Sequence, residues 1–289
     1  MGARAARAMS LGLGAVAARG VLGRLLRDRR STALDRTNFR GRRVNLAGGP
    51  ALAAGATIGA VAGAPGPAAA AAALTAGAVA GAVGCYDDVV GNRPEQKTAK
   101  GFAGHLGALR QGRVTSGLVK IAGVGAVGLA AAALLAADPT VRGHRGRRAA
   151  GPGARAVDVL LGAGVIAGTA NLLNLLDLRP GRALKVGSLI AAPLVAGPAG
   201  GLAAGPLGAA GALLPADLDE RIMLGDCGAN AFGALLGVAI AARTGPLGRA
   251  GVLAGLVALT AASEKVSFTS VIERTAWLRH LDALGRRRA

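Results

Sequence analysis

The chain has 289 residues, of which 52% are hydrophobic but only 2% aromatic, and glycine alone accounts for 48 positions. Its 34 Lys and Arg outweigh 15 Asp and Glu, which gives a formal net charge of +19 at pH 7. Such a balance is typical of nucleic-acid-binding proteins, but uncharged apolar stretches of about 15–20 residues recur and approach the length that spans a bilayer. The sequence therefore predicts an all-α protein, a polytopic transmembrane helical bundle, and excludes nucleic acid as a partner.

The first segment, residues 1–26, has a basic start and a short apolar part. Arg19 and Arg24 interrupt the apolar part and no clear small-residue cleavage site follows, so we expect a weak first helix rather than a cleavable signal peptide. The next segment reads "RDRRSTALDRTNFRGRRVNLAGG". Anchoring at an anionic membrane surface explains its arginines and the terminal "GRRRA", so membrane lipids are expected partners.

Four polar islands interrupt the apolar sequence, at residues 27–49, 87–113, 168–185 and 217–230. Two apolar spans separate each island from the next. The pair at residues 50–86, for example, is broken by the turn sequence "GAPGP". An even number of crossings returns the chain to the same side, so we expect all four islands on one face of the membrane.

The islands are rich in Lys and Arg, which favours the cytoplasmic side for this face, although "RGHRGRR" at residues 142–148 falls on the opposite side. With about nine spans, the C-terminus would be cytoplasmic too. We expect one integral membrane domain over residues 1–289, multi-pass in the cell membrane with cytoplasmic catalytic loops. Residues 264–289 would form an interfacial amphipathic helix and a basic tail.

Polar residues stand where several apolar segments end. Asp87 and Asp88 end one of them, where ionisable groups are costly and by default functional. Asn171, Asn174 and Asp177 follow at three-residue steps, which keeps them within about 60° of one another on a helix. Structural alternatives exist for both groups: a helix end that reaches interfacial water for the aspartates, and interhelical hydrogen bonds for the asparagines.

Asp226 in "LGDCGAN" has glycines close by, which allow a ligand to approach the backbone. Together, carboxylate and amide oxygens from three loops on one face predict a Mg²⁺–diphosphate site. Mg²⁺ prefers oxygen ligands and usually takes one or two carboxylates, with water and phosphate completing its shell. Neighbouring basic residues would neutralise the remaining phosphate charge.

Histidine and cysteine are not expected to contribute to this site. The three histidines are isolated in the sequence and are predicted to be non-catalytic: His105, His144 and His280. Cys85 and Cys227 show no metal or redox spacing and are predicted to be small reduced residues.

In order and topology, "YDDVVG", "NLLNLLD" and "LGDCGANAFGALLG" resemble the motifs of the polyprenyl-phosphate N-acetylhexosamine-1-phosphate transferases. That family includes phospho-N-acetylmuramoyl-pentapeptide transferase and the UDP-GlcNAc:undecaprenyl-phosphate GlcNAc-1-phosphate transferases. The similarity covers about residues 36–273, and "NFRGRRVNLAGG" is similar to the family's first cytoplasmic loop. The resemblance implies Mg²⁺-dependent transfer of a sugar 1-phosphate from a UDP-sugar to polyprenyl (undecaprenyl) phosphate, with release of UMP, in cell-envelope glycan biosynthesis.

The resemblance also implies roles for individual residues. Asp226 and Asn174 would be the metal ligands. Asp87 and Asp88 would orient or deprotonate the lipid phosphate, and Asn171 and Asp177 would shape the nucleotide-sugar pocket. Basic residues complete the expected substrate-binding set: Lys97, Lys100, Arg182 and Lys185.

The chain departs from the family pattern in places. Met223 stands where members often place an aromatic residue against the uracil ring, Ala229 replaces an expected serine, and a histidine-rich last loop is absent. One alternative is therefore a catalytically silent relative that binds lipid phosphate or scaffolds an envelope complex. A secondary transporter would need repeats or broken helices at the midplane, whereas these polar residues gather at one face. The sugar, the polymer, the lipid length and whether the chain forms a homodimer stay open.

Overall fold

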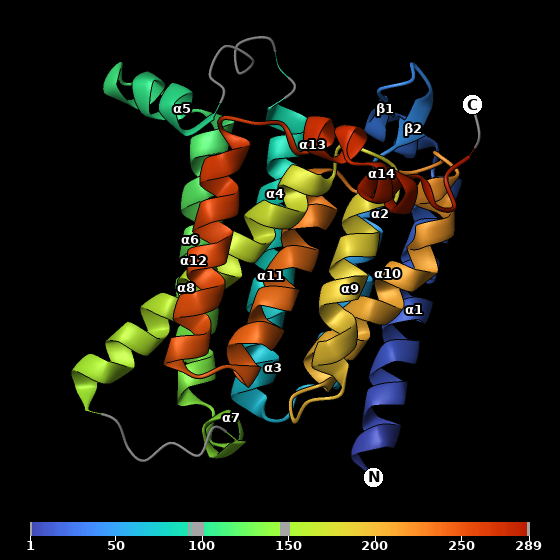
Figure 1. Cartoon of the computed structure of the whole chain (residues 1–289). Coiled ribbons are helices and arrows are strands. Elements are labelled where there is room, and N and C mark those ends of the chain that lie inside the picture. The colour runs from blue at the N-terminus through green and yellow to red at the C-terminus, as the bar shows by residue number, and fades with distance from the viewer. Residues whose placement is uncertain (1, 92, 94–100, 145–150, 288–289) are drawn as a thin grey trace.

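The computed structural model in Figure 1 describes residues 2–91, 93, 101–144 and 151–287 as a bundle of long helices. The helices of the bundle are α1 (Ala3–Arg27), α2 (Gly48–Ala62), α3 (Pro67–Leu74), α4 (Ala80–Val90), α6 (Ser116–Ala137), α8 (Pro152–Leu176), α9 (Arg182–Val195), α10 (Gly201–Leu218), α11 (Gly225–Arg243) and α12 (Pro246–Ser263). A π-helical turn at Thr75–Val79 joins α3 to α4. These helices match the apolar segments of the sequence, with α8 extending far enough to include both Asn171 and Asn174.

Short elements lie at the two ends of the bundle. They are α5 (Gly101–Arg110), α7 (Pro139–His144), α13 (Phe268–Arg274), α14 (Ala276–Ala283), a 3-10 turn (Arg29–Leu34) and the antiparallel strands β1 (Asp35–Thr37) and β2 (Arg43–Asn45). Asp35 pairs with Asn45 in the hairpin register. The backbone N–H of Met223 donates to Asn45 O at 3.0 Å, so the hairpin rests on the loop between α10 and α11.

Among the described residues, six helices are long and apolar enough to cross a membrane by length and composition: α1, the α3–α4 unit, α6, α8, α11 and α12. They differ in how deeply they lie inside the bundle. In the most apolar 18-residue stretch of α11, 83% of the residues are buried, whereas only 11% are buried in that of α12. An apolar helix with most of its surface uncovered by protein suits lipid contact. The predicted all-α, membrane-embedded bundle is confirmed to this extent.

The described residues of the four polar islands lie at one end of the bundle, which we call the polar end (Figure 1, top). Hydrogen bonds join them there. Arg36 donates to Asp88 O at 3.1 Å, and the N–H of Gly181 donates to Asp217 Oδ2 at 2.9 Å. The N-terminus and α7 lie at the opposite end. The prediction that the four islands share one end of the bundle is thus confirmed.

Glycines let α1, α2 and α10 approach one another at backbone distance. A Cβ added to Gly205 of α10 would lie 2.2 Å from the carbonyl carbon of Gly59 on α2. One added to Gly14 of α1 would lie 2.2 Å from Gly205 O. In lipid, the hydrophobic effect does not drive helices together. Close approach of small residues stabilises helix pairs there through van der Waals packing.

We predict that Gly205→Ala destabilises the bundle, because the new methyl group meets backbone atoms that cannot move aside as side chains do. The expected loss is about 1–3 kcal/mol, the range for overpacking a tight core. Thermal unfolding of purified protein in detergent measures it. Gly211→Ala is the matched control, since Gly211 lies on the same helix with open space around its Cβ position. Equal unfolding midpoints for the two variants would contradict the close packing.

Candidate functional site

Four helices bring polar side chains together at the polar end. Asp87 comes from α4, Lys120 from α6, Asn174 from α8 and Asp226 from α11. The Lys120 ammonium lies 2.5 Å from Asp226 Oδ2 and 2.8 Å from Asp87 Oδ2. The Asn174 amide donates to the other carboxylate oxygen of Asp226. We call these four residues the acid–lysine cluster.

Asp88 holds the first turn of α11. Its two carboxylate oxygens accept the backbone N–H groups of Asp226 and Cys227, each at 2.9 Å. The first N–H groups of a helix have no partner within the helix, so a carboxylate there satisfies them and complements the helix dipole. Gly225 precedes this turn with φ +59°, a left-handed conformation that glycine adopts most easily. Asp88 therefore positions Asp226.

The acid–lysine cluster can be tested for fit to Mg²⁺. Within the described residues, no group of three or more His, Cys, Asp and Glu side chains is arranged to hold a metal ion. Two carboxylates, Asp87 and Asp226, nevertheless converge on one cation, the Lys120 ammonium. Their oxygens, with an Asn174 amide turned to present its oxygen, are of the kind that Mg²⁺ takes when phosphate and water complete its shell. The oxygen atoms of Asp87, Asp226 and Asn174 are therefore of the chemical type that binds Mg²⁺.

A cavity of about 180 Å³ opens among the loops of the polar end; we call it the loop cavity. Phe39, Asp177, Arg179 and Met223 contribute to its lining. The guanidinium of Arg179 lies 4.2 Å from the centre of the Phe39 ring, a cation–π contact. Asp177 Oδ2 is buried with no hydrogen-bond partner in the described part of the chain. Burial, reinforced by the negative charge of Asp217, raises the pKa of Asp177 well above its ordinary value.

A second cavity, of about 210 Å³, lies between helices α6, α8, α11 and α12; we call it the interhelical cavity. It is lined by Lys120, Ile121, Val124, Ala167, Gly168, Asn171, Asn174, Asn230 and Thr260. Two members of the acid–lysine cluster thus face it. Asn171 lines the interhelical cavity and donates to Thr260 Oγ1 at 3.0 Å, whereas Asp177 lines the loop cavity. The two residues that were expected to shape one pocket therefore line different cavities.

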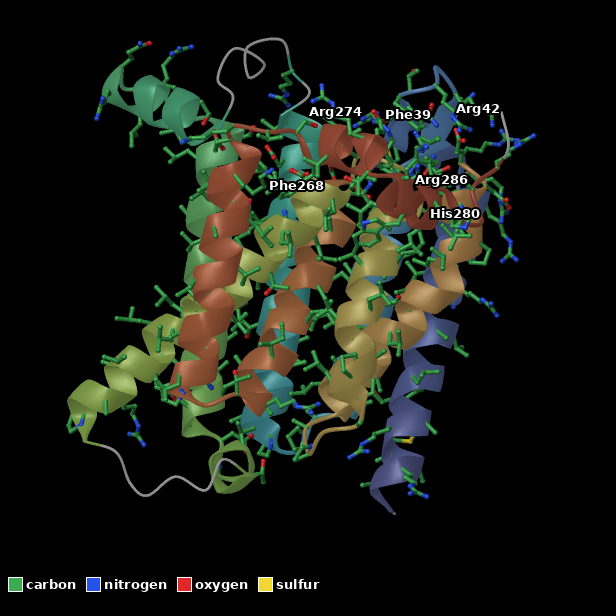
Figure 2. The ribbon with its side chains drawn as sticks, viewed as in Figure 1. Phe39, Arg42, Phe268, Arg274, His280 and Arg286 are labelled. Carbon is green, nitrogen blue, oxygen red and sulfur yellow. A yellow bond between two sulfur atoms is a disulfide. The ribbon has the colours of Figure 1, made fainter. Side chains whose placement is uncertain are left out.

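Arg182 and Lys185 bind the C-terminal segment, residues 268–287, rather than the acid–lysine cluster. Arg182 makes a two-pronged contact with Asp282 at 2.8 and 2.9 Å. The Lys185 ammonium donates to the carbonyl oxygens of Leu281 and Asp282 at 3.0 and 2.6 Å. Arg286, from the segment itself, donates to Asp282 at 2.7 Å and to Pro180 O at 2.8 Å. Figure 2 shows Arg286 and His280 on this segment beside the hairpin that carries Arg42 and Phe39.

Lys97 and Lys100 lie outside the described residues. The main residue that the sequence analysis missed is Lys120, although a signal for it was present. It is the one charged residue between Ser116 and Ala137, and an ionisable group inside an apolar helix is a functional candidate.

The expectation of two reduced cysteines is wrong for this structure, which joins Cys85 of α4 to Cys227 of α11 in a disulfide, with Cα atoms 4.4 Å apart. The two helices come this close because Gly84 packs on the backbone of α11. A Cβ at Gly84 would lie 2.2 Å from Asp226 O. The bond therefore connects the two helices that carry the acidic motifs.

Comparison with known proteins finds neither a matching family model nor a matching curated protein. The resemblance to the transferase motifs therefore rests on the chain's own residues.

We predict that Asp282→Asn loosens the C-terminal segment, because it removes the charge that Arg182 and Arg286 share. Burial alone would raise the pKa of Asp282, but Arg182 and Arg286 lower it below its ordinary value. The stabilisation is then complete above the ordinary carboxyl pKa of about 3.9 and is lost as the pH falls through the lowered value. Fluorescence quenching of Trp277, the chain's one tryptophan, reports on the segment.

At neutral pH the variant should show more quenching than the wild type, and the difference should shrink in acid. Asp219→Asn is the control, since Asp219 pairs only loosely with Arg221, at 3.7 Å on the surface. Identical quenching in the wild type and Asp282→Asn at neutral pH would mean that the ion pairs do not hold the segment.

Proposed function

We propose that this chain transfers a sugar 1-phosphate, an N-acetylhexosamine 1-phosphate by resemblance, from a UDP-sugar to a polyprenyl phosphate and releases UMP. The supporting observation is the convergence of Asp87, Lys120, Asn174 and Asp226 at one end of a membrane bundle, next to two cavities of different character. Lys120 and Asn174 line the interhelical cavity, and Asp177, three residues beyond Asn174, lines the loop cavity.

The loop cavity suits the nucleotide sugar. It is bounded by polar loops, it contains the Phe39–Arg179 pair, and Asp177 offers a buried oxygen that can accept a hydrogen bond. A base or sugar ring packs against aromatic and guanidinium faces, and arginine binds phosphate oxygens. We assign Arg179, rather than Arg182, to the donor side, because Arg179 lines the loop cavity and pairs only loosely with the exposed Glu273, at 3.5 Å. Arg182 is instead buried against Asp282 at 2.8 Å.

The interhelical cavity suits the lipid acceptor. Ile121, Val124 and Ala167 give it apolar walls, and Lys120 supplies positive charge at its polar side. A polyprenyl phosphate has the matching combination of an apolar chain and an anionic head. The apolar, largely uncovered surface of α12 next to the cavity supports this assignment, because in a membrane lipid would cover it.

The chemistry needs charge neutralisation more than a strong base. A phosphate monoester is already largely dianionic near neutral pH, so an oxygen of the lipid phosphate attacks the sugar-proximal phosphorus directly. The bond from that phosphorus to the bridging oxygen breaks, and UMP carries away the electron pair. Lys120 neutralises charge on the reacting phosphates, while Asp87 and Asp226 hold its ammonium in place.

Mg²⁺ held by Asp226 and Asn174 would supply further neutralisation of the diphosphate. Asp88 keeps Asp226 at the start of α11 and does not itself move a proton, since both its oxygens bind backbone N–H groups.

We further propose that about nine segments cross the membrane, with α2, α9 and α10 added to the six long apolar helices, and that the polar end faces the cytoplasm. At 1.5 Å per residue, the 15 residues of α2 and 14 of α9 span roughly 21–23 Å. That is less than the bilayer core of about 30 Å, so the bilayer would thin there or the helices would lean on longer neighbours. The excess of Lys and Arg in the islands supports the cytoplasmic side.

A catalytically silent protein that binds lipid phosphate is the second candidate. One observation favours it: the Lys120 ammonium already pairs with Asp87 and with Asp226, the carboxylate that would hold the metal ion. Binding of lipid phosphate with no product from any UDP-sugar would distinguish this candidate from the transferase.

We predict that Asp226→Asn and Lys120→Met each lower turnover by orders of magnitude. Lys120→Met removes the positive charge that faces the reacting phosphates, and Asp226→Asn removes the carboxylate that holds the Lys120 ammonium and would hold Mg²⁺. UMP release from a panel of UDP-sugars with undecaprenyl phosphate and Mg²⁺ measures the effect. Removal of divalent metal by a chelator should abolish turnover of the wild type. Asp226→Asn should also weaken Mg²⁺-dependent binding of the UDP-sugar.

Arg155→Gln is the control, because Arg155 is an exposed cation at the opposite end of the bundle, at the start of α8. Its turnover should match that of the wild type. Wild-type turnover that survives complete metal chelation would refute the metal-dependent mechanism, and a normal rate in Lys120→Met would remove Lys120 from the active site.

A further inference from the structure

Asn230 is a buried polar residue that the chemistry above does not use. It lies on α11, four residues after Asp226, and is 3% exposed. Its amide nitrogen is buried and has no hydrogen-bond partner among the described residues. A buried donor without a partner is unfavourable, so a ligand or water that accepts its hydrogen is expected.

The interhelical cavity is where that acceptor would sit, because Asn230 lines it together with Lys120. The other two amides of the cavity are engaged: Asn171 donates to Thr260, and Asn174 donates to Asp226. Within the described part of the chain, Asn230 is therefore the cavity amide whose N–H groups remain available. Its position one helical turn from Asp226 puts the donor on the membrane side of the acid–lysine cluster.

The cavity's chemistry selects an oxyanion attached to an apolar chain. Its apolar side chains, Ile121 and Val124 among them, favour hydrocarbon, whereas a lysine and an unpaired amide favour oxygen acceptors with negative charge. A phosphate monoester on a lipid chain carries both features. A free phosphate ion lacks the chain, and an alcohol lacks the charge.

We propose that Asn230 determines acceptor specificity: its amide donates to a phosphate oxygen of a lipid phosphate monoester whose chain lies in the interhelical cavity. Lys120 faces the same phosphate. The identity of this ligand as the acceptor rests on the proposed function, but the binding contact does not require transfer to occur.

Equilibrium binding of radiolabelled farnesyl phosphate to the full-length protein in detergent tests the contact. Asn230→Leu removes both polar atoms at similar size and should weaken binding roughly ten- to a hundredfold, the range for losing one hydrogen bond to a charged group. Asn230→Asp keeps the shape but places a carboxylate against the phosphate, so it should weaken binding at least as much. Asn230→Ser keeps a shorter donor and should fall between the wild type and Asn230→Leu.

Competition by other ligands shows which part of farnesyl phosphate the site recognises, the phosphate group, the apolar chain or both. Dodecyl phosphate should displace farnesyl phosphate if the phosphate monoester and an apolar chain suffice, whereas displacement by farnesyl but not by dodecyl phosphate would restrict the site to isoprenoid chains. Farnesol and inorganic phosphate should compete weakly in both cases. Farnesol binding should not change in Asn230→Leu, because the alcohol lacks the phosphate oxygen.

Thr169→Val is the matched control. Thr169 is a buried polar residue of α8 that does not line the cavity, and its hydroxyl donates to Val165 O at 2.7 Å within its own helix. The control should bind farnesyl phosphate as the wild type does. Thermal unfolding in detergent identifies variants that retain the fold, and Asn230→Asp, which keeps the side-chain shape, decides the outcome if Asn230→Leu unfolds.

Wild-type affinity in Asn230→Leu, or in Asn230→Asp if only that variant folds, would overturn the inference and leave water as the partner of the amide. A wild type that binds farnesyl phosphate through Asn230 but releases no UMP from any UDP-sugar would instead refute the proposed transferase and leave this contact standing. The two failures are therefore distinguishable.

Discussion

The contact between α4 and α11 is the constraint on which the site depends. Gly84 removes the side chain that would keep the helices apart, and Asp88 then accepts the first N–H groups of α11. The disulfide between Cys85 and Cys227 joins the same two helices. Asp87 and Asp226 are next to these contacts in the sequence, so their carboxylates lie close together, where both pair with Lys120. Asp88 contributes to the site by holding the backbone of Asp226 and Cys227 in position.

Charge explains why Lys120 belongs with these acids. Carboxylates that meet near the edge of an apolar bundle repel each other more strongly than in water, and one ammonium between Asp87 and Asp226 relieves that repulsion. In the proposed function, a phosphate would compete for Lys120 and a metal ion would compete for the carboxylates. A site that holds an internal cation in this way can exchange contacts with a substrate without leaving a buried charge unpaired.

The C-terminal segment changes how the basic residues of the polar end are used. Arg182 and Lys185 follow the asparagine motif closely, but both are committed to residues 281–284. Arg179, whose guanidinium covers the Phe39 ring, remains beside the loop cavity. Positive charge near a motif in the sequence is therefore a poor guide to which residues line a cavity at the polar end, because long side chains bind whichever acceptors the fold brings close.

The sequence by itself determined the all-helical membrane bundle and the shared end of the four polar islands, because span length and even crossings are properties of the chain alone. It also marked Asp87, Asp226 and Asn174, since polar groups at the ends of apolar segments stand out against their surroundings. Only the tertiary structure decided that Asp88 caps α11, that Lys120 lies between two carboxylates, that Arg182 faces Asp282, and that Asn230 opens on a cavity. These depend on the rotation and close approach of helices far apart in sequence. Helix rotation is set by packing of small residues such as Gly84 and Gly205, which leave no periodic signal in a chain with glycine at 48 positions.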